Sequence, residues 1–380
     1  MATIRVNLPG PSSPVEARAG DTRATRREGD RSYDVVCGRE ILGSVGVLVR
    51  DAGPRRAIVI ADAAVAESHA AHVMDSLHKA GVEAAALTVP SGEASKSLEA
   101  AGRLWEGLAA LAADRSTHIV AVGGGVVGDL AGFVAATFAR GLPVWQVPTT
   151  LVSQVDSAIG GKTGINLAAG KNLVGVFWQP RGVVADIATL ATLPQREFVS
   201  GLAEVVKYGM ILDAGFFDWL ELNADAVLAR EPAALGQAVE RSAALKAAVV
   251  EQDEREISGL RAALNYGHTF GHAYETAAGY GVLLHGEAVA IGMARAARLA
   301  LDLGRIQADV VARQDRLLSR FQLPVSPPAH LRDAEPLLLI MGRDKKTVGG
   351  QLRFVLPSRI GHVDLVDGVP AEAVRRVLEA

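Results

Sequence analysis

Four polar side chains recur at helical spacing in the segment RAALNYGHTFGH, residues 261–272. At about 100° per residue, they project within a narrow arc of one helix face; they are Arg261, Asn265, His268 and His272. The residues between them are mostly apolar, as in a buried helix. A buried helix does not carry a cation, an amide and two imidazoles on one stripe unless these groups have partners. The stripe therefore predicts a binding or catalytic site.

A third imidazole, His285, follows in the segment LLHGEAVA, at the expected start of a later helix. Glu204 lies among apolar residues in GLAEVVKY, three positions before Lys207. Residues at this spacing on a helix most often form an ion pair. A carboxylate on an apolar helix equally completes a Glu/His/His metal site, which leaves coordination positions open for substrate oxygens. The residues suggest a metal site, with core histidines and a helical ion pair as the alternative.

Composition limits the kind of protein that carries this site. The chain has 380 residues, 49% hydrophobic and 21% charged, which is ample for two ordinary domains. The formal net charge of −3 gives no long-range attraction to nucleic acid or to an anionic membrane. Cys37 is the only cysteine, which excludes an internal disulfide and fits a reducing cytoplasm. Charges interrupt the apolar runs before the ~20 residues of a membrane span, and residues 1–31 lack the apolar region of a signal peptide. We expect a soluble, cytoplasmic protein.

Strand and helix patterns alternate in the first half of the chain. Short apolar runs predict strands over residues 56–61, 83–89, 118–122 and 143–147, with helices over 63–80 and 95–113. This alternation predicts a parallel sheet covered by helices, with ligands at the carboxyl ends of the strands. Helical periodicity then takes over, at residues 198–211, 233–250, 260–277 and 287–303, and a hairpin-like segment follows at 344–356. The sequence thus predicts a loose N-terminal extension (1–31), a Rossmann-like α/β domain (32–194) and a mostly α-helical domain (195–380).

A glycine-rich turn, GGGVVG at residues 123–128, ends the third predicted strand and opens a helix. It satisfies G-x-G-x-x-G, whose backbone N–H groups face a pyrophosphate. It follows an internal strand, however, so it does not match the usual Rossmann fingerprint. Polar residues end the neighbouring strands at Asp62, Glu93, Lys96, Thr149 and Thr150. A dinucleotide spread over several strand ends explains them together, whereas turn and N-cap chemistry explains each separately.

Glycine-flanked lysines follow in DSAIGGKTG (156–164) and GKN (170–172). The segment is not a Walker A motif, because the first glycine of that motif would fall at Asp156. Glycine permits close backbone approach, and Lys162 and Lys171 offer point charges for a phosphate. The pattern is typical of an anion cradle, with surface-loop lysines as the alternative.

Taken together, the motifs resemble the 3-dehydroquinate synthases, a family of sugar-phosphate cyclases. The resemblance rests on GGGVVGD, PTTL, DSAIGGKT, GKNLVG, GLAEVVK, LNYGHTFGH, HGEAVA and DKK, and runs from about residue 32 to the C-terminal end. It implies an N-terminal NAD-binding α/β domain, a helical C-terminal domain, a catalytic divalent metal ion, usually zinc or cobalt, and an active site in the cleft between the domains.

The resemblance also implies residue roles. It makes Glu204, His268 and His285 the metal ligands and His272 a partner of substrate. Substrate carboxylate and hydroxyls would be held by Asp156, Lys207, Lys246 and Arg261. The substrate phosphate would be held by Lys162, Asn172, Asn265, His272, and Lys345 or Lys346. Cofactor contacts would come from Asp62, Glu93, Lys96, Gly124, Gly125, Val126, Asp129, Thr149, Thr150, Lys171 and Thr192.

The implied reaction converts 3-deoxy-D-arabino-heptulosonate 7-phosphate into 3-dehydroquinate and phosphate, a step of the shikimate pathway, with NAD reduced and then reoxidised. By the same resemblance, Arg140 reaches the substrate phosphate of a second subunit, which implies a homodimer. From its position alone, Arg140 is equally a cation that complements the end of a helix. The alternatives are another sugar-phosphate cyclase, an iron-type polyol dehydrogenase and a non-catalytic nucleotide-binding protein. A dehydrogenase has little need for lysines around a leaving phosphate.

Overall fold

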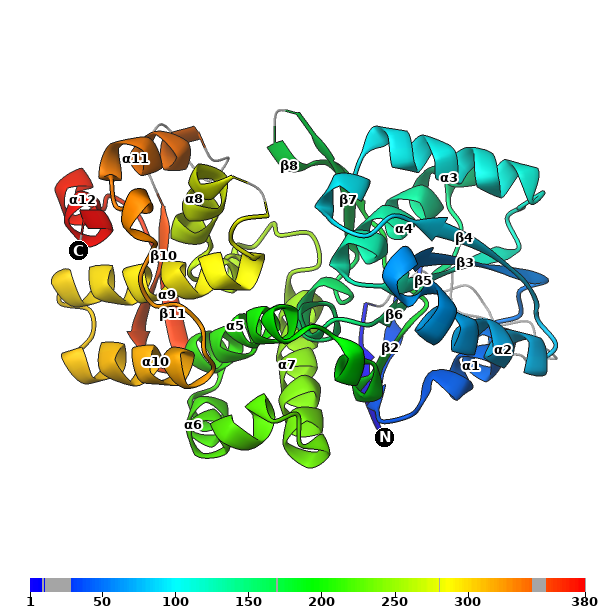
Figure 1. Cartoon of the computed structure of the whole chain (residues 1–380), viewed down its shortest axis with the longest axis horizontal. Helices are drawn as coiled ribbons and strands as arrows, with labels where there is room; N and C mark the ends of the chain where they lie inside the picture. Colours follow the sequence, from blue (N-terminus) through cyan, green and yellow to red (C-terminus); the bar gives the residue numbers. More distant parts are fainter. Residues whose placement is uncertain (9, 11–28, 169, 280, 344–352, 380) are drawn as a thin grey trace. The chain divides into compact units, whose positions relative to one another are not determined.

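The predicted apolar runs form the strands of one sheet in a computed structural model, which describes residues 1–8, 10, 29–168, 170–279, 281–343 and 353–379. Its parallel strands are β2 (Tyr33–Gly38), β3 (Arg56–Asp62), β4 (Glu83–Val89), β5 (Thr117–Gly123), β6 (Val144–Pro148) and β9 (Gly182–Asp186). The strand order is β1-β2-β9-β6-β5-β3-β4. Strands β2, β3, β4, β5 and β6 of this sheet are labelled in Figure 1. Every residue of β5, β6 and β9 is buried, as expected where helices cover both faces of a parallel sheet.

Two apolar clusters cover the two faces of this sheet. On one face, Ile58 and Ile119 of the strands pack with residues of α3 (Leu98–Ala110) and α4 (Gly125–Thr137). On the other face, Val59 and Val120 pack with residues of α1 (Val45–Asp51) and α2 (Ala71–Lys79). Neighbouring residues of one strand thus enter opposite clusters, as the two-residue period of a strand requires. The predicted α/β class is confirmed.

The order of strands also defines where a ligand binds. The chain leaves β3 for β4 on one side of it, then crosses to β5 on the other side. In open α/β sheets, ligands bind at such a reversal, beyond the carboxyl ends of the strands. Here these ends are Asp62 of β3 and Gly123 of β5, and a Cβ built on Gly123 would lie 3.1 Å from the Cβ of Asp62.

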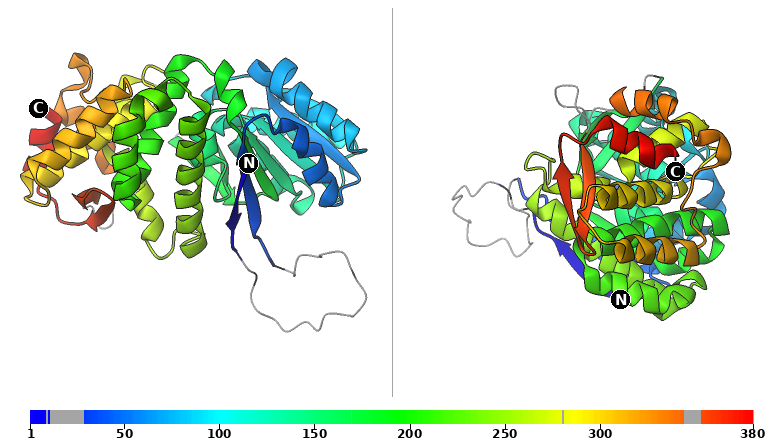
Figure 2. Two further views of the ribbon diagram at one scale, coloured as in Figure 1. Left: turned by 90° about the horizontal axis from the view of Figure 1, so that it is seen from below. Right: turned by 90° about the vertical axis from the view of Figure 1, so that its left-hand side faces the viewer.

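Two antiparallel pairs are found in this part of the chain, one at the edge of the sheet and one separate from it. Ala2–Val6, inside the segment predicted as a loose extension, forms strand β1, which pairs antiparallel with β2 at the edge of the sheet (Figure 2). Thr3 and Arg5 are exposed while Val6 is buried, a pattern typical of an edge strand. Strands β7 (Lys162–Leu167) and β8 (Gly170–Phe177) form a separate antiparallel hairpin.

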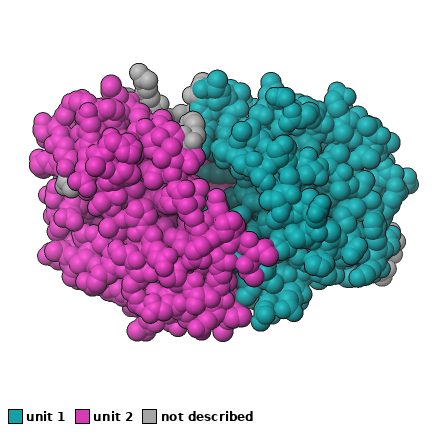
Figure 3. All heavy atoms as spheres, viewed as in Figure 1, with its two compact units in different colours: residues 1–190, 246–255 teal, residues 191–245, 256–380 magenta. Residues whose placement is uncertain are grey.

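The chain forms two compact units, coloured separately in Figure 3. Unit 1 comprises Met1–Leu190 with Lys246–Arg255, and unit 2 comprises Ala191–Leu245 with Glu256–Ala380. The division near residue 190 lies close to the predicted boundary after residue 194. The difference is helix α7 (Pro232–Gln252), whose last turns belong to unit 1.

Helices dominate unit 2. Besides most of α7, they are α5 (Gln195–Leu212), α6 (Ala214–Leu228), α8 (His268–Ala278), α9 (His285–Asp302), α10 (Ala308–Arg320), α11 (Ala334–Arg343) and α12 (Ala371–Glu379). Helix α9 packs against α8 and α5, and most of its residues are buried. Strands β10 (Phe354–Arg359) and β11 (His362–Val366) form a hairpin. The hairpin predicted at 344–356 lies largely outside the described residues, and β10 pairs with a later segment instead. No helix in the described part of the chain has the length and apolar character that crossing a membrane requires.

One predicted helix consists of two elements. Residues 260–277 form a 3-10 helix, η8 (Leu260–Asn265), and then α8, which begins at His268. Gly267 between them has φ of +79°, a left-handed conformation that interrupts a helix. A Cβ on Gly267 would lie 2.6 Å from Cγ of Met293 in α9, so close packing also requires glycine there. The prediction that all four polar residues share one helix face is therefore wrong, because Arg261 and Asn265 belong to η8.

Candidate metal centre and dinucleotide turn

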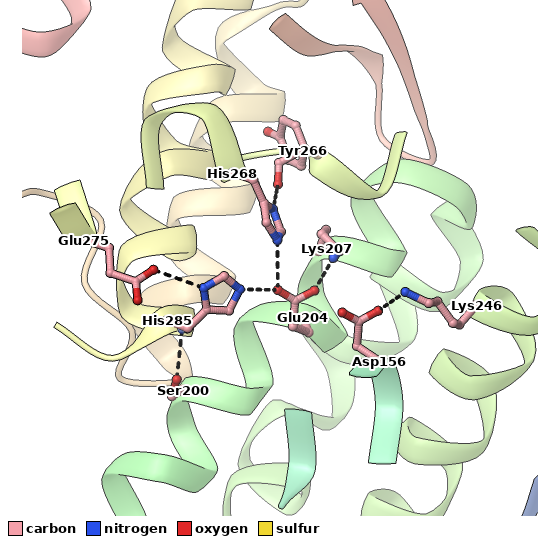
Figure 4. A network of polar contacts seen from close by, with 10 residues as sticks. Asp156, Ser200, Glu204, Lys207, Lys246, Tyr266, His268, Glu275 and His285 are labelled. Atoms are coloured by element: carbon pink, nitrogen blue, oxygen red, sulfur yellow. Dashed lines mark hydrogen bonds and ion pairs between the residues drawn. The ribbon is translucent and has the colours of Figure 1, made fainter. Parts of the chain in front are cut away.

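Three side chains from three helices converge in unit 2 (Figure 4). Glu204 lies in the middle of α5, and its side chain is fully buried; His268 begins α8 and His285 begins α9. Oε1 of Glu204 lies 3.7 Å from Nε2 of His268 and 3.8 Å from Nε2 of His285. The structure thus brings together the three residues predicted to hold a metal ion.

The second nitrogen of each imidazole already has a partner. Nδ1 of His268 donates to the backbone carbonyl of Tyr266 at 3.1 Å, and Nδ1 of His285 lies 3.4 Å from Oε2 of Glu275 (Figure 4). These contacts favour the tautomer in which Nε2 carries a lone pair toward Glu204. Loss of hydration lowers the pKa of His285, but the contact with Glu275 and the charge of Glu204 outweigh it, so that its pKa is raised. Carboxylates thus make this ring a more basic ligand.

The donor set fits a divalent cation. Oε1 of Glu204 is buried, and the described residues offer it no hydrogen-bond donor. Three ligand atoms about 2.1 Å from an ion in tetrahedral arrangement lie about 3.4 Å from one another. The observed separations of 3.7 and 3.8 Å are close to this value. The other carboxylate oxygen, Oε2, is in contact with the buried ammonium of Lys207. The carboxylate of Glu204 therefore forms the predicted ion pair through Oε2 and faces the two imidazoles through Oε1.

Glycines allow the helices to approach closely enough for this site. A Cβ on Gly292 of α9 would lie 2.0 Å from the carbonyl oxygen of Gly267, just before α8. A Cβ on Gly286 would lie 1.8 Å from the carbonyl oxygen of Ser200 in α5. Any other residue at either position would push His285 and its helix away from the remaining ligands.

The other predicted site residues of unit 2 lie in several places. The ring of His272 is 5.5 Å from that of His268 and 6.0 Å from that of His285, and His272 is not in the ligand group. Arg261 is fully buried, with Nε 3.7 Å from Oε1 of Glu256. Asn265 ends η8, and Thr192 ends the 3-10 helix η7 (Ile187–Thr192). Lys345 and Lys346 lie outside the described residues.

In unit 1, the glycine-rich turn forms the start of α4. Its N-cap is Gly124, which has no side chain to cap the helix, so no cap from the described residues occupies its first backbone N–H groups, as an anion site requires. A Cβ on Gly124 would lie 3.0 Å from Cγ2 of Thr150, and one on Gly125 would lie 2.8 Å from Oγ of Ser157. The amide of Thr149 donates to the carbonyl of Gly123 at 2.9 Å. The predicted contacts Asp62, Gly124, Gly125, Val126, Thr149 and Thr150 therefore gather at the ends of β3, β5 and β6.

A second group of predicted residues surrounds Lys96. Its ammonium, in a side chain only 5% exposed, donates to Oδ2 of Asp129 at 2.7 Å and to Oδ1 of Asn172 at 2.5 Å. Burial raises the pKa of Asp129, and the charge of Lys96 opposes this shift. Glu93 accepts from Nδ2 of Asn166 at 2.7 Å and lies 3.8 Å from Nζ of Lys171. Residues predicted for cofactor and phosphate therefore form one network.

The remaining predicted residues of unit 1 also lie at turns. Asp156 contacts the ammonium of Lys246, which is nearly buried on the last turns of α7. Lys162 begins β7 and is exposed. Arg140 ends the 3-10 helix η5 (Phe138–Arg140), where both Ala139 and Arg140 have positive φ, of 49° and 67°.

Sequence reasoning missed several residues that the structure makes part of these sites. Asn166 accepts from the backbone N–H of Asn172 at 2.9 Å and so joins the hairpin to Glu93. Glu275 and the carbonyl of Tyr266 orient the two imidazoles. Glu275 lies three positions after His272 on α8, a helical spacing that was available as a signal. The backbone carbonyl of Tyr266 leaves no signal in the sequence.

Known structures share this fold. A 2-epi-5-epi-valiolone synthase from Streptomyces hygroscopicus subsp. jinggangensis, with NAD+ and Zn2+ bound, is 28% identical with a TM-score of 0.83, covering 91% of this chain and 95% of that chain. A 2-deoxy-scyllo-inosose synthase complexed with carbaglucose-6-phosphate, NAD+ and Co2+ is 30% identical with a TM-score of 0.82, covering 92% and 96%. Fold and site together define a sugar-phosphate cyclase.

Sequence comparison narrows the class. A family model of the 3-dehydroquinate synthase N-terminal region matches residues 86–200, and a model of the C-terminal region matches residues 201–347. A 3-dehydroquinate synthase of Rhodopirellula baltica is 52% identical over 319 residues, 83% of this chain and 84% of the relative. The chain belongs to the 3-dehydroquinate synthase family and is an enzyme of that type. The predicted resemblance is confirmed.

Proposed function

We propose that the protein converts 3-deoxy-D-arabino-heptulosonate 7-phosphate into 3-dehydroquinate and phosphate. The observation that carries this proposal is the convergence of Glu204, His268 and His285, with Nδ1 of both imidazoles held elsewhere, in a chain of this family. A divalent zinc or cobalt ion bound there would withdraw electron density from substrate oxygens and lower the pKa of a hydroxyl. Lys207 balances the charge of Glu204 and presents a buried ammonium on the same helix.

NAD is the second proposed cofactor. The open N-terminus of α4 and the absent side chains of Gly124 and Gly125 support a pyrophosphate at the ends of β3 and β5. NAD would supply a hydride acceptor that is restored within each turnover. Asp62 accepts the backbone N–H of Ala64 at 2.9 Å and so fixes the turn that follows β3.

The chain's other polar residues suit a substrate that carries a phosphate and a carboxylate. Lys162, Asn172 and Lys171 offer cationic and amide donors on one hairpin, where charge develops as phosphate departs. Asp156 and Lys246 form a nearly buried pair that offers both an acceptor and a donor to substrate hydroxyls. In unit 2, His272 stands beside the imidazole ligands without joining them and offers a further donor or proton carrier.

The test uses purified protein with the heptulosonate phosphate and a much smaller amount of NAD than of substrate. We expect many phosphates released per NAD, a product with the mass of 3-dehydroquinate, and no steady rise in the absorbance of NADH. Stoichiometric accumulation of NADH would move the protein to the polyol-dehydrogenase alternative. Phosphate release only from a different sugar phosphate would make it another cyclase.

We further propose a cytoplasmic homodimer in which Arg140 acts on the phosphate of the partner's substrate. Its side chain is exposed, and positive φ at two successive non-glycine residues is a costly conformation that a functional orientation would explain. A guanidinium binds phosphate through paired hydrogen bonds. Arg140→Ala should raise KM while metal binding is kept. Mixed dimers of Arg140→Ala and Lys162→Ala subunits should regain one intact site, and no recovery despite subunit exchange would leave Arg140 as a helix-end cation.

A further inference from the structure

A ladder of three contacts joins α5 to the first turn of α9. On α5, Arg196, Ser200 and Glu204 are spaced by four residues and so lie on one face of the helix. On α9, their partners are the first three residues, in reverse order: Glu287, Gly286 and His285. The last pair belongs to the metal centre. The first two pairs have no ligand role.

Of the two contacts outside the metal centre, that of Arg196 has the larger number of hydrogen bonds. Nε of Arg196 donates to Oε1 of Glu287 at 2.7 Å, and Nη2 donates to Oε2 at 2.8 Å and to the carbonyl of Val282 at 2.7 Å. Glu287 is only 14% exposed, and its Oε2 also accepts the backbone N–H of Leu284 at 2.8 Å. Exposed ion pairs contribute little, but a bidentate guanidinium on a largely buried carboxylate that also caps a helix is a geometrically defined contact. It fixes residues on both sides of His285.

The Ser200 contact acts on the residue next to His285. The backbone N–H of Gly286 donates to Oγ of Ser200 at 3.0 Å. This N–H is one of those at a helix start that have no partner within the helix. Because a Cβ on Gly286 would lie 1.8 Å from the carbonyl of Ser200, the two backbones are as close as glycine allows. Ser200 lies one turn before Glu204 on α5, so its hydrogen bond to Gly286 fixes the position of the first turn of α9 along the axis of α5.

His285 needs this support more than the other ligands do. Its side chain is 41% exposed, against 11% for His268 and none for Glu204. Packing therefore restrains it least, and the chain on its N-terminal side forms a turn rather than a helix. We propose, on the basis of the metal centre proposed above, that Arg196 and Ser200 are positioning residues that set the distance between His285 and Glu204 and thereby the affinity for the metal ion. They touch neither metal nor substrate.

Unit 2 contains a matched control. Nε of Arg241 donates at 2.7 Å to Oδ2 of Asp213, and Asp213 caps the N-terminus of α6 by accepting from Phe216. The side chains of Arg241 and Asp213 are 51% and 17% exposed, close to the 56% and 14% of Arg196 and Glu287. Both pairs join an arginine to a carboxylate that caps a helix. The helix that Asp213 caps carries no residue of the metal centre.

The experiment titrates Co2+ into metal-free full-length protein and records the dissociation constant and the visible spectrum of the bound ion. Arg196→Met and Ser200→Ala should each weaken Co2+ binding by about 10-fold, and together by up to about 100-fold, as found for outer partners of metal ligands. The bands of bound Co2+ should shift, because they report coordination geometry. Arg241→Met should keep the wild-type affinity and spectrum within about twofold, while losing as much thermal stability as Arg196→Met without metal.

Arg196→Lys keeps the charge without the paired geometry, so it should fall between wild type and Arg196→Met, and it serves if the methionine variant does not fold. Wild-type affinity and spectrum in both Arg196→Met and Ser200→Ala would overturn the positioning role alone. Equal weakening in Arg241→Met would replace it by general destabilisation. If the wild-type protein itself held no Co2+, the metal centre and the positioning role would both be wrong.

Discussion

The metal centre of unit 2 and the dinucleotide turn of unit 1 both contain paired charges, but they differ in what a ligand would add. In unit 2, Glu204 pairs with Lys207 through Oε2, but Oε1 is buried and the described residues offer it no hydrogen-bond donor. In unit 1, the charged groups pair with one another, Lys96 with Asp129 and Lys246 with Asp156. A cation at the metal centre therefore adds a missing partner, whereas a ligand in unit 1 exchanges one partner for another. Exchange of one partner for another has a smaller net free energy than supplying a partner to a buried acceptor that lacks one.

The largest effect should come from removing a ligand of the metal centre. His268→Ala should lose tightly bound divalent ion and reduce activity by about 10³-fold or more, because the ion's several kcal/mol of transition-state stabilisation go with it. His272→Ala should keep stoichiometric metal, since its ring stands beside the ligand group without joining it. Metal analysis and phosphate-release assays measure both. Metal retained without His268 but lost without His272 would reverse the ligand assignment.

The next effect is a pH dependence that sets the two units apart. His118 of β5 is buried and accepts a hydrogen bond from Nε1 of Trp145 at 3.2 Å, and burial lowers its pKa to about 4. The neutral ring contributes stability above the unfolded pKa of 6.5, and this contribution is lost as the pH falls from there toward 4. The loss amounts to about 3 kcal/mol. The pKa of His285 is raised, so in metal-free protein its contribution to stability has the opposite pH dependence: it is present at low pH and is lost as the pH rises.

Unfolding of wild type and His118→Gln between pH 4 and 7 checks this. Glutamine keeps an acceptor for Trp145 but does not titrate, so the variant should lose less stability on acidification. Equal losses in both proteins would show that other groups carry the acid sensitivity of unit 1.

A smaller effect should follow from Lys96→Met. The change leaves Asp129 and Asn172 without their shared ammonium, and a hydrogen bond to a charged group contributes about 1.5–3 kcal/mol. NAD affinity should therefore fall by about 10- to 100-fold, measured by calorimetry, while Co2+ affinity stays within about twofold. Arg103→Met, which removes an exposed ion pair with Glu99 on the nearby helix α3, should change neither. Loss of metal in Lys96→Met would mean that the two sites are not independent.

The local elements and the kinds of groups at the site follow from the amino-acid sequence alone. Strands β3, β4, β5 and β6 begin and end within about two residues of the predicted runs, because an apolar run bounded by turn residues is a local signal. The sequence also predicts the glycine-rich turn, the polar residues at the strand ends and the types of ligand, since each depends on residues close together in the chain. The family motifs then assigned their roles.

How these groups face one another depends on packing between segments that are far apart in the chain. The helical period of residues 260–277 continues through Gly267, yet the helix is interrupted there, where Gly267 has a positive φ. The carbonyl of Gly267 lies so close to α9 that a Cβ on Gly292 would be 2.0 Å from it. Other contacts join segments that are far apart in the chain, so no periodic pattern in the sequence reports them. They are the pairing of β1 with β2, the contact of Glu275 with His285, and the contacts of Arg196 and Ser200 with α9. Periodicity reports which face of an element is buried. Which atoms meet across that face depends on the packing distance between elements, and here glycine backbones set it.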